Sequence, residues 1–229
     1  MKKKIAILGS TGSIGKNLVD IISKDKKNFE VVLLTTNQNT KTLLKQAKYL
    51  KAKNIIVTDK KEYLLIKNKI KKVNIFSNFN QFDKIFKSKV DYIMSAISGI
   101  DGLEPTFRSI KYTKKIAIAN KESIICAWNI LSKELKKNKT KFIPVDSEHF
   151  SIWSVLKNIH NKNIDQIFIT ASGGPFYKLP LSKFSQIKVK DAIKHPNWSM
   201  GKKISVDSAT MMNKVFEVIE AKNIFNLSF

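Results

Sequence analysis

The sequence lacks several features, and each absence excludes a class of protein. Cysteine occurs once, at Cys126, so no disulfide can form within the chain and a cytoplasmic location is expected. No apolar run approaches the roughly 20 residues of a membrane span, so no membrane association is expected. The first apolar run, residues 5–8, ends at Gly9 and is too short for the apolar segment of an export signal.

Arginine and acidic residues are scarce as well. The 229 residues include 42 Lys and Arg but only 18 Asp and Glu, for a formal net charge of +24, and Arg108 is the only arginine. Proteins that read bases or clamp phosphates favour the planar guanidinium of arginine. The lysines are also scattered along the chain, which indicates a solvated surface and no nucleic-acid partner. The alternative, a basic nucleic-acid binder, would show a steep salt dependence of DNA retention.

Short apolar runs alternate with segments whose apolar residues have helical spacing. Strands are predicted over seven segments, at residues 5–8, 31–34, 55–57, 73–75, 92–96, 116–119 and 141–145. Helices are predicted between them, at residues 14–22, 41–51, 60–71, 79–87, 103–111 and 122–137. This order predicts an α/β fold, with a parallel sheet and helices on both faces, in a first domain over residues 1–146.

After about residue 147 the alternation stops. The elements predicted there are a helix, a strand and a last helix, at residues 150–158, 166–171 and 209–225. Two polar, glycine-containing loops are predicted at residues 172–176 and 195–201. This mixture predicts a second, α+β domain over residues 147–229.

Three glycines, Gly9, Gly12 and Gly15, lie between the first strand and the first helix. Glycine allows a tight turn and a close approach of backbone N–H groups to a pyrophosphate, and the helix N-terminus favours the anion. The pattern therefore predicts a Rossmann-like dinucleotide site, with an ordinary glycine-rich turn as the alternative. Residues 35–41, after the second strand, contain no acid to hold the ribose of NAD, so they favour NADP.

Two carboxylates lie close together in a chain that is otherwise poor in acids, in the sequence VDSEH at residues 145–149. In an extended backbone Asp146 and Glu148 project to the same side and repel each other, unless a cation lies between them or one takes up a proton. Oxygen ligands suit Mg²⁺ or Mn²⁺. In the last helix Glu217 can supply a third carboxylate, and Asn213 shares its face. The alternative is an ordinary exposed helix face.

Further polar residues occur near the predicted strand ends and in the loops. Ser208 precedes the last predicted helix and can cap it or bind phosphate. Lys121 follows a strand and is either one more solvated lysine or a substrate contact. His195 is either a loop histidine without a role or part of a site. Trp198 in the same polar loop suits a lid that covers a ligand and excludes water.

Six motifs carry a resemblance to a known family. They read ILGSTGSIG, ANKES, PVDSEH, SGGPF, HPNWSMG and KISVDSATMMNK, at residues 7–15, 119–123, 144–149, 172–176, 195–201 and 203–214. In this order they resemble the 1-deoxy-D-xylulose 5-phosphate reductoisomerase family, and they span nearly the whole chain. The first motif alone is shared with many dehydrogenases, whereas the set is highly specific.

The resemblance implies an NADPH-dependent enzyme that also needs a divalent cation, Mg²⁺ or Mn²⁺, with Co²⁺ as a further option. Its substrate would be a phosphorylated sugar, 1-deoxy-D-xylulose 5-phosphate. Its product would be 2-C-methyl-D-erythritol 4-phosphate, in non-mevalonate isoprenoid biosynthesis. The cation would hold the ketone and hydroxyl oxygens during a rearrangement by retro-aldol cleavage and re-aldolisation. NADPH would then reduce the resulting aldehyde.

The resemblance also implies roles for residues of the matching motifs. The metal ligands would be Asp146, Glu148 and Glu217. The substrate contacts would be Ser147, Glu148, Ser172, His195, Trp198, Ser208, Asn213, Lys214 and Glu217. The cofactor contacts would be Thr11, Gly12, Ser13, Ile14, Gln38, Asn39, Asn120, Glu122 and Gly201. The catalytic groups would be Lys121, Glu148 and His195.

The sequence departs from the family pattern in two respects. Where the family commonly has Gly-Lys-Asn after the second strand, this chain has Asn37-Gln38-Asn39, which removes a positive charge from the expected 2′-phosphate site. Family chains also continue with strands used in dimerisation and a C-terminal helical domain. The second domain is therefore expected to be incomplete, which puts the homodimer of the family in question. The alternatives are a truncated, poorly active or binding-only remnant, or a plain NADP dehydrogenase without a cation.

Overall fold

The computed structural model describes residues 1–68, 72–156, 164–195 and 201–227. The chain divides into two units, unit 1 over Met1–Val145 and unit 2 over Asp146–Phe229. Unit 1 holds the alternating strands and helices, and unit 2 follows where that alternation stops.

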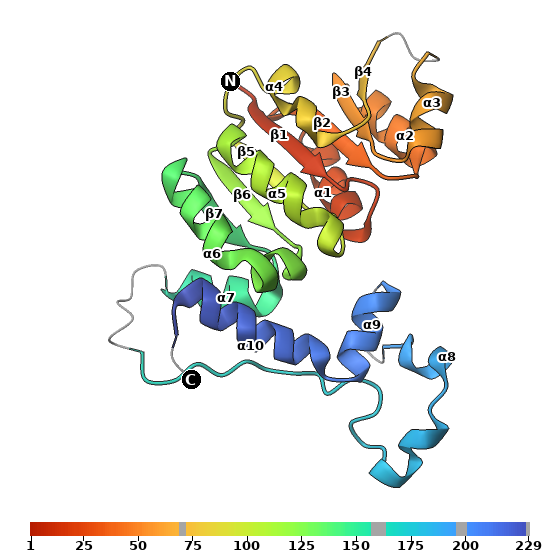
Figure 1. Cartoon of the computed structure of the whole chain (residues 1–229), viewed down its shortest axis with the longest axis vertical. Coiled ribbons are helices and arrows are strands. Elements are labelled where there is room, and N and C mark those ends of the chain that lie inside the picture. The colour runs from red at the N-terminus through yellow and green to blue at the C-terminus, as the bar shows by residue number, and fades with distance from the viewer. Residues whose placement is uncertain (69–71, 157–163, 196–200, 228–229) are drawn as a thin grey trace. The chain divides into compact units, whose positions relative to one another are not determined.

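Unit 1 is built on a parallel sheet of seven strands in the order β4-β3-β2-β1-β5-β6-β7 (Figure 1). The strands are β1 (Lys3–Leu8), β2 (Phe29–Thr36), β3 (Asn54–Val57), β4 (Asn74–Phe76), β5 (Tyr92–Ser95), β6 (Lys115–Ile118) and β7 (Lys141–Pro144). Every neighbouring pair runs parallel. The predicted α/β fold class is thereby confirmed, and the ends of each of the seven strands predicted for this unit lie within two residues of those of an observed strand.

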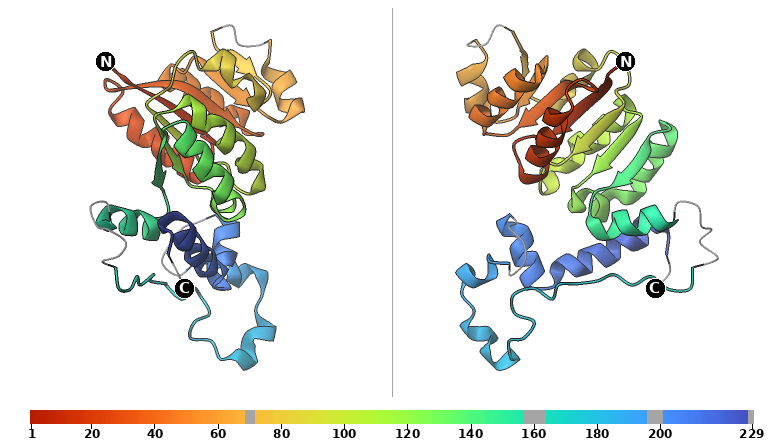
Figure 2. Two further views of the ribbon diagram at one scale, coloured as in Figure 1. Left: turned by 60° about the vertical axis from the view of Figure 1, so that its left-hand side comes forward. Right: turned by 180° about the vertical axis from the view of Figure 1, so that it is seen from behind.

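The helices of unit 1 cover both faces of this sheet, as the two views from other sides show (Figure 2). On one face lie α1 (Ser13–Lys24) and α2 (Thr40–Leu50), and on the other lie α5 (Leu103–Ser109) and α6 (Lys121–Lys137). Because both faces are covered, the central strands are apolar without alternation. All four residues of β3 are buried, and so are the last four residues of β1.

Side-chain caps explain where several of these helices begin. The carbonyl oxygen of the Asn39 side chain accepts from the backbone N–H of Thr42 at the start of α2, at 3.2 Å. Asp59 does the same for Glu62 in α3 (Lys60–Ile66), at 2.9 Å. Each such cap satisfies one of the N–H groups that a helix start leaves without a partner. In the described part of the chain, no helix has the length and apolarity that a bilayer crossing needs.

The strand order places a crevice at the carboxyl ends of the central strands. From β1 the chain proceeds outward through β2 and β3 to β4, and it then returns to the other side of β1 at β5. Loops that leave β1 and β5 therefore separate to opposite faces of the sheet. Open α/β sheets bind their ligands at such a switch point.

Among the described residues, unit 2 is helical. Its α-helices are α7 (Ser147–Leu156), α8 (Val189–Ala192), α9 (Lys202–Ala209) and α10 (Met212–Phe225). The last predicted helix, residues 209–225, is α10 with a later start. The break before α10 is Met211, whose φ of 61° ends the helical path of α9. Ser208 thus lies in the last turn of α9, which corrects its predicted place before the start of the last helix.

The strand predicted over residues 166–171 is wrong. Within this segment Ile167 and Ile169 are half-buried, whereas Phe168 between them is 83% exposed. A strand also needs a hydrogen-bonding neighbour, and the described part of unit 2 offers no second strand. The two isoleucines instead line a cavity beside Val218 and Ala221 of α10. The described residues of this unit therefore form no sheet, where an α+β domain was predicted.

Three glycines of unit 1 differ in whether a side chain at their position would be strained by the backbone conformation, would overlap a neighbouring segment, or both. A Cβ on Gly9 would lie 2.7 Å from the backbone oxygen of Ala96, and Gly9 has a φ of +79°. Gly99 has a similar φ of +77° but open space around it. A Cβ on Gly12 would approach no closer than 3.5 Å, and its φ is ordinary.

We expect Gly9→Ala to destabilise the protein most, Gly99→Ala by about 1–3 kcal/mol from backbone strain alone, and Gly12→Ala least. The reason is that only Gly9 combines a left-handed φ with a clash against the backbone of a neighbouring loop. Urea unfolding of the three variants would measure this order. Equal losses for Gly9→Ala and Gly99→Ala would contradict the proposed overlap with Ala96.

Candidate functional site

Two hydrogen bonds join the glycine turn after β1 to Thr35, near the end of β2. The backbone N–H of Gly9 donates to the Thr35 hydroxyl at 2.8 Å, and that of Ser10 donates to the Thr35 carbonyl at 2.9 Å. Gly12 closes the turn by donating from its backbone N–H to the carbonyl of Gly9 at 3.1 Å, and it directly precedes α1. The turn therefore presents the N-terminus of α1 at the crevice of unit 1, where an anion is favoured.

Two buried hydrogen bonds between Ser10 and Gln46 also fix this turn. The Ser10 hydroxyl donates to Gln46 Oε1 at 2.8 Å, and Gln46 Nε2 donates to the Ser10 carbonyl at 2.9 Å. Gln46 belongs to α2 and is 7% exposed. Sequence reasoning missed this residue, although its spacing offered a signal. Gln46 shares the apolar face of α2 with Leu43 and Ala47, where a polar side chain needs a buried partner.

A cavity of about 670 Å³ opens beside the turn in unit 1. Its lining includes Thr11 and Gly12 from the predicted cofactor contacts. Gly9 of the predicted glycine turn and Asn37 of the expected 2′-phosphate site also line it. The rest of the lining was not predicted: Thr35, Thr36, Thr58, Phe79, Ala96, Ile97, Ser98, Ile100, Asp101, Glu104 and Pro105. Ser13 and Ile14 follow as the first two residues of α1. The cavity thus lies at the carboxyl ends of β1, β2, β3 and β5, where the strand order predicts a ligand.

The two amides that follow Asn37 are engaged within the protein. Gln38 Nε2 donates to Asp59 Oδ2 at 3.2 Å, and Asn39 caps α2. The hydrogen bond from the backbone N–H of Glu62, and next the one from Gln38, hold the pKa of Asp59 below its usual value. An ionised carboxylate is therefore fixed close to the segment that would meet a 2′-phosphate.

Asn120, predicted as a cofactor contact, is buried, and its side chain forms a hub of three hydrogen bonds within the protein. Its Nδ2 donates to the carbonyls of Ile97 and Gly99, both at 2.7 Å, and its Oδ1 accepts from the backbone N–H of Ser123 at 2.6 Å. Asn120 is 3% exposed, so these three bonds use its donors and acceptor within the protein. It joins the loop after β5, which lines the cavity, to the start of α6. Lys121 and Glu122 form the first turn of α6 and are half-buried.

In unit 2, the VDSEH segment forms a helix start instead of an extended strand end. Asp146 Oδ1 accepts from the backbone N–H of Glu148 at 3.3 Å, and the Asp146 carbonyl accepts from Phe150 at 2.8 Å. Asp146 thus caps α7, and Glu148 lies in its first turn. Helical geometry, not the extended geometry that the sequence suggested, therefore holds the two carboxylates together. The N-terminus of a helix favours both negative charges.

The third carboxylate comes from α10. Glu217 is 2% exposed, and its Oε1 accepts from Asn213 Nδ2 at 2.5 Å one turn earlier. One oxygen from each of Asp146, Glu148 and Glu217 lies within 4.8 Å of the other two. The structure brings together the three residues predicted as metal ligands, which are separated by up to 71 positions (217 − 146) in the sequence.

Lys214 supplies only part of the positive charge that would balance these three carboxylates. Lys214 Nζ lies 3.4 Å from Glu148 Oε1, forms a close ion pair with Glu217, and donates to the carbonyl of Thr170. Three carboxylates and one ammonium group leave a surplus of two negative charges when all are ionised. Oxygen ligands at this spacing with this surplus fit a hard divalent cation.

The pKa of Glu148 shows how the cluster is stabilised. Burial by itself raises that pKa, but hydrogen bonds with Asp146 and Ser147 and the charge of Lys214 outweigh it and lower the pKa from 4.5 to about 2. The Ser147 hydroxyl donates to Glu148 Oε2 at 2.7 Å. Glu148 therefore remains ionised at neutral pH, as a cation ligand must be.

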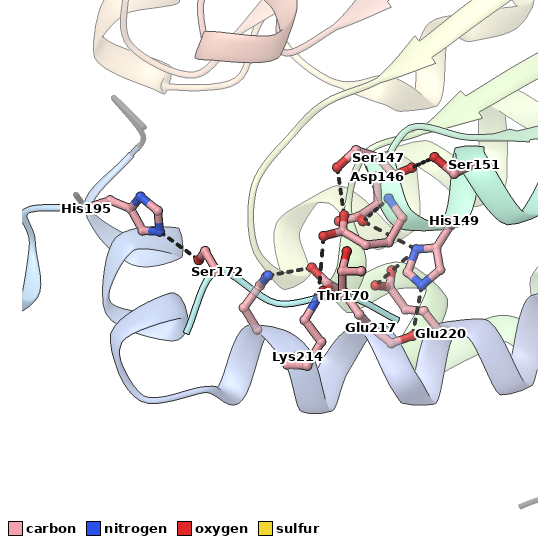
Figure 3. A network of polar contacts seen from close by, with 12 residues as sticks. Asp146, Ser147, His149, Ser151, Thr170, Ser172, His195, Lys214, Glu217 and Glu220 are labelled. Carbon is pink, nitrogen blue, oxygen red and sulfur yellow. Dashed lines mark hydrogen bonds and ion pairs between the residues drawn. The ribbon is translucent and has the colours of Figure 1, made fainter. Parts of the chain in front are cut away.

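The polar network around this cluster is drawn in Figure 3. The cluster borders a cavity of about 570 Å³ in unit 2. The predicted substrate and metal residues that line it are Asp146, Ser147, Glu148, Ser172, His195, Ser208, Asn213, Lys214 and Glu217. Ser172 Oγ and His195 Nε2 lie 3.1 Å apart on its wall. The lining also includes Thr170, Ala171, Gly173, Ile204 and Met211, which sequence reasoning missed. Gly201 caps α9, and Trp198 falls outside the described residues.

Comparisons with known proteins agree on one family. The family model described as 1-deoxy-D-xylulose 5-phosphate reductoisomerase matches residues 5–128, and the model of the C-terminal domain of that enzyme matches residues 142–225. The chain is 62% identical to the 1-deoxy-D-xylulose 5-phosphate reductoisomerase of Pelagibacter ubique (strain HTCC1062), over 99% of this chain and 60% of that protein. It is 44% identical to the protein of the same name from Wolbachia pipientis wMel, over 99% of this chain and 58% of the relative.

Solved structures show the same likeness. The 1-deoxy-D-xylulose 5-phosphate reductoisomerase of Zymomonas mobilis in complex with NADPH aligns with a TM-score of 0.89 and 34% identity, over 100% of this chain and 59% of that one. A DOX-P reductoisomerase in complex with NADPH, fosmidomycin and magnesium aligns with a TM-score of 0.89 and 34% identity, over 99% of this chain and 59% of that one. The chain spans about 60% of the length of these relatives.

The Asn120 hub leads to a stability prediction. We expect Asn120→Ala to lower the free energy of unfolding by about 2–4 kcal/mol, because buried groups left without partners cost about 1–3 kcal/mol each. Asn120→Asp keeps the acceptor for Ser123 but turns a carboxylate oxygen towards two carbonyls, so a similar loss is expected. Asn78→Ala, which removes an exposed cap, is the control and should change stability by less than about 1 kcal/mol. Urea unfolding measures all three, and equal effects at Asn78 and Asn120 would refute the hub.

The lowered pKa of Glu148 predicts a pH dependence. Its folded-state pKa of about 2 lies below the ordinary 4.5, so the ionised form favours folding. This contribution is fully present above about pH 4.5 and is lost as the pH falls towards 2. We expect the difference in unfolding free energy between the wild type and Glu148→Gln to shrink from pH 6 to pH 3, measured without added cation. Glu30→Gln, at an exposed ion pair with Lys53, should show little difference throughout.

Proposed function

The chain belongs to the 1-deoxy-D-xylulose 5-phosphate reductoisomerase family, and on that premise we propose that it converts 1-deoxy-D-xylulose 5-phosphate to 2-C-methyl-D-erythritol 4-phosphate. The reaction is a rearrangement assisted by a divalent cation, followed by reduction with NADPH, in isoprenoid biosynthesis in the cytoplasm. One observation carries the proposal: three carboxylates and a lysine converge on a cavity that also gathers a serine–histidine pair and an amide. A dehydrogenase without a rearrangement step has no need of such a cluster.

Asp146, Glu148 and Glu217 are the proposed cation ligands. The fit rests on their oxygen chemistry, on the spacing within 4.8 Å, and on the negative charge that Lys214 leaves unbalanced. Once bound, Mg²⁺ or Mn²⁺ supplies Lewis acidity towards the ketone and hydroxyl oxygens of the substrate. Asn213 holds Glu217 Oε1, and the Ser147 hydroxyl holds Glu148 Oε2, so both ligand side chains are oriented in advance.

The remaining polar residues of the cavity are proposed to bind the sugar phosphate. Lys214 offers an ammonium group, and Ser172, Ser208 and His195 offer further hydrogen-bond donors along the same cavity. A phosphate needs several donors and a positive charge, and this set provides both. Ser172 and His195 already lie within hydrogen-bond distance of each other, which limits the number of orientations that each can adopt.

NADPH is proposed to bind in the crevice of unit 1, with Thr11, Gly12, Ser13 and Ile14 at its pyrophosphate and Gln38 and Asn39 at its 2′-phosphate end. The fit rests on the shape of the glycine turn, in which Gly9 takes a φ of +79°, and on the N-terminus of α1 beside the cavity. NADPH supplies the hydride for the reduction. Asn120 shapes the loop after β5, while Lys121, Glu122 and Gly201 stay predictions for contacts with substrate or cofactor.

The assay is oxidation of NADPH with 1-deoxy-D-xylulose 5-phosphate, with and without Mg²⁺ or Mn²⁺. We expect turnover only with the cation, and a loss of at least about 100-fold in kcat/KM for Asp146→Asn and Glu217→Gln, because each removes a charged ligand. Asp207→Asn, which breaks a surface ion pair with Lys203, is the control and should keep its activity. Turnover that is independent of the cation and survives Asp146→Asn would favour a plain dehydrogenase instead.

A further inference from the structure

His149 is a buried residue of α7 to which no role has been assigned so far. It follows Glu148 directly and is 1% exposed. Its Nε2 lies 2.8 Å from the backbone oxygen of Glu217 in α10, 68 positions away. A carbonyl oxygen can only accept, so Nε2 carries the proton and donates. The imidazole therefore links the helix that begins at Asp146 to the helix that carries Glu217.

The other ring nitrogen faces carboxylates from both helices. Nδ1 lies 3.8 Å from Asp146 Oδ1 and 3.8 Å from Glu220 Oε2. Glu220 is 1% exposed and follows Glu217 by three positions, so both acids lie on the same side of α10. Figure 3 shows the ring of His149 between the two elements, with Glu217 and Glu220 on one side and Asp146 on the other.

The three proposed cation ligands belong to two separate helices, so their spacing depends on the offset between α7 and α10. Lys214 also joins the helices through Glu148, but a lysine side chain has four rotatable bonds and adapts to a change in that offset. A buried imidazole with two rotatable bonds does not adapt in this way. Asn213 holds the Glu217 carboxylate while His149 holds the Glu217 backbone, which leaves this ligand little freedom.

We propose that His149 is a positioning residue, which sets the offset between α7 and α10 through its bond to Glu217 and thereby preorganises the oxygen ligands for the cation. This inference rests on the proposed function, because it concerns the same cation site. It attributes the effect of His149 to one hydrogen bond rather than to the volume of its ring. Loss of a group that orients a ligand typically weakens metal affinity about 10–100-fold.

The test is the affinity of the purified chain for Mn²⁺ alone, measured by isothermal titration calorimetry and by the electron paramagnetic resonance signal of free Mn²⁺. His149→Leu keeps an apolar side chain of moderate size without a donor, and a loss of about tenfold or more in Mn²⁺ affinity is expected. His149→Gln places an amide N–H at about the reach of Nε2 and should stay within about threefold of the wild type. His149→Asn has a shorter amide that cannot reach Glu217 and should behave like His149→Leu.

Two controls separate positioning from a loss of folding. Ser154→Ala lies on the same helix, where the Ser154 hydroxyl bonds to the Ser151 carbonyl, and it should leave Mn²⁺ affinity unchanged. NADPH affinity, followed by fluorescence in the same samples, should be the same in every variant. Should His149→Leu fail to fold by circular dichroism, the contrast between His149→Gln and His149→Asn decides the question.

The outcomes distinguish this inference from the proposed function. If the wild type binds no Mn²⁺, or if Asp146→Asn binds it equally well, the proposed cation site is wrong and the inference falls with it. If the wild type binds Mn²⁺ and the His149 variants bind it as tightly, only the positioning role is overturned. Equal weakening in His149→Gln and His149→Asn would likewise overturn it, because only glutamine restores the donor. Weakening confined to His149→Leu and His149→Asn supports it.

Discussion

The proposed cation site of unit 2 depends on the convergence of three carboxylates, from Asp146, Glu148 and Glu217. Their oxygens lie within 4.8 Å of one another, and the burial of Glu217 reduces the screening that water would provide. Lys214 offsets part of this charge, and the N-terminus of α7 offsets a further part at Asp146 and Glu148. We propose that the acids are crowded in this way so that a cation can join them. The groups around Glu148 keep it ionised, as such a ligand must be.

Unit 1 depends on a constraint of a different kind, the close approach of backbone segments at the crevice. Gly9 packs against the loop after β5 so tightly that no side chain fits between them. That loop is held in turn by Asn120, and the far side of the glycine turn is held by Gln46. The groups that shape this cavity are thus mostly buried amides that do not line it. A ligand at the turn would meet backbone that is already in place, which lowers the entropic cost of binding.

How far sequence reasoning succeeded depended on whether a feature was local. The strands of unit 1 could be predicted, since apolar runs of about four residues are too short for a helix and are typical of strands covered on both faces. Gly9 could be recognised because a tight turn after a strand requires it. The strand at residues 166–171 was wrong because a short apolar run does not show whether a second strand is available, and the described part of unit 2 offers none. Ser208 was misplaced because the break at Met211, a non-glycine residue with positive φ, leaves no signal in the sequence.

By itself the sequence determined the α/β fold of unit 1, the glycine turn and the identity of the three acids, because periodicity and rare residue types act over a few neighbouring positions. Only the tertiary structure decided how these acids meet. Asp146 caps a helix instead of ending a strand, and Glu217 arrives from a helix 71 positions later (217 − 146). His149 had no visible partner in the sequence, because that partner is a backbone carbonyl, which every residue carries. Which carbonyl lies opposite a given side chain follows from packing between distant helices, and no local pattern encodes it.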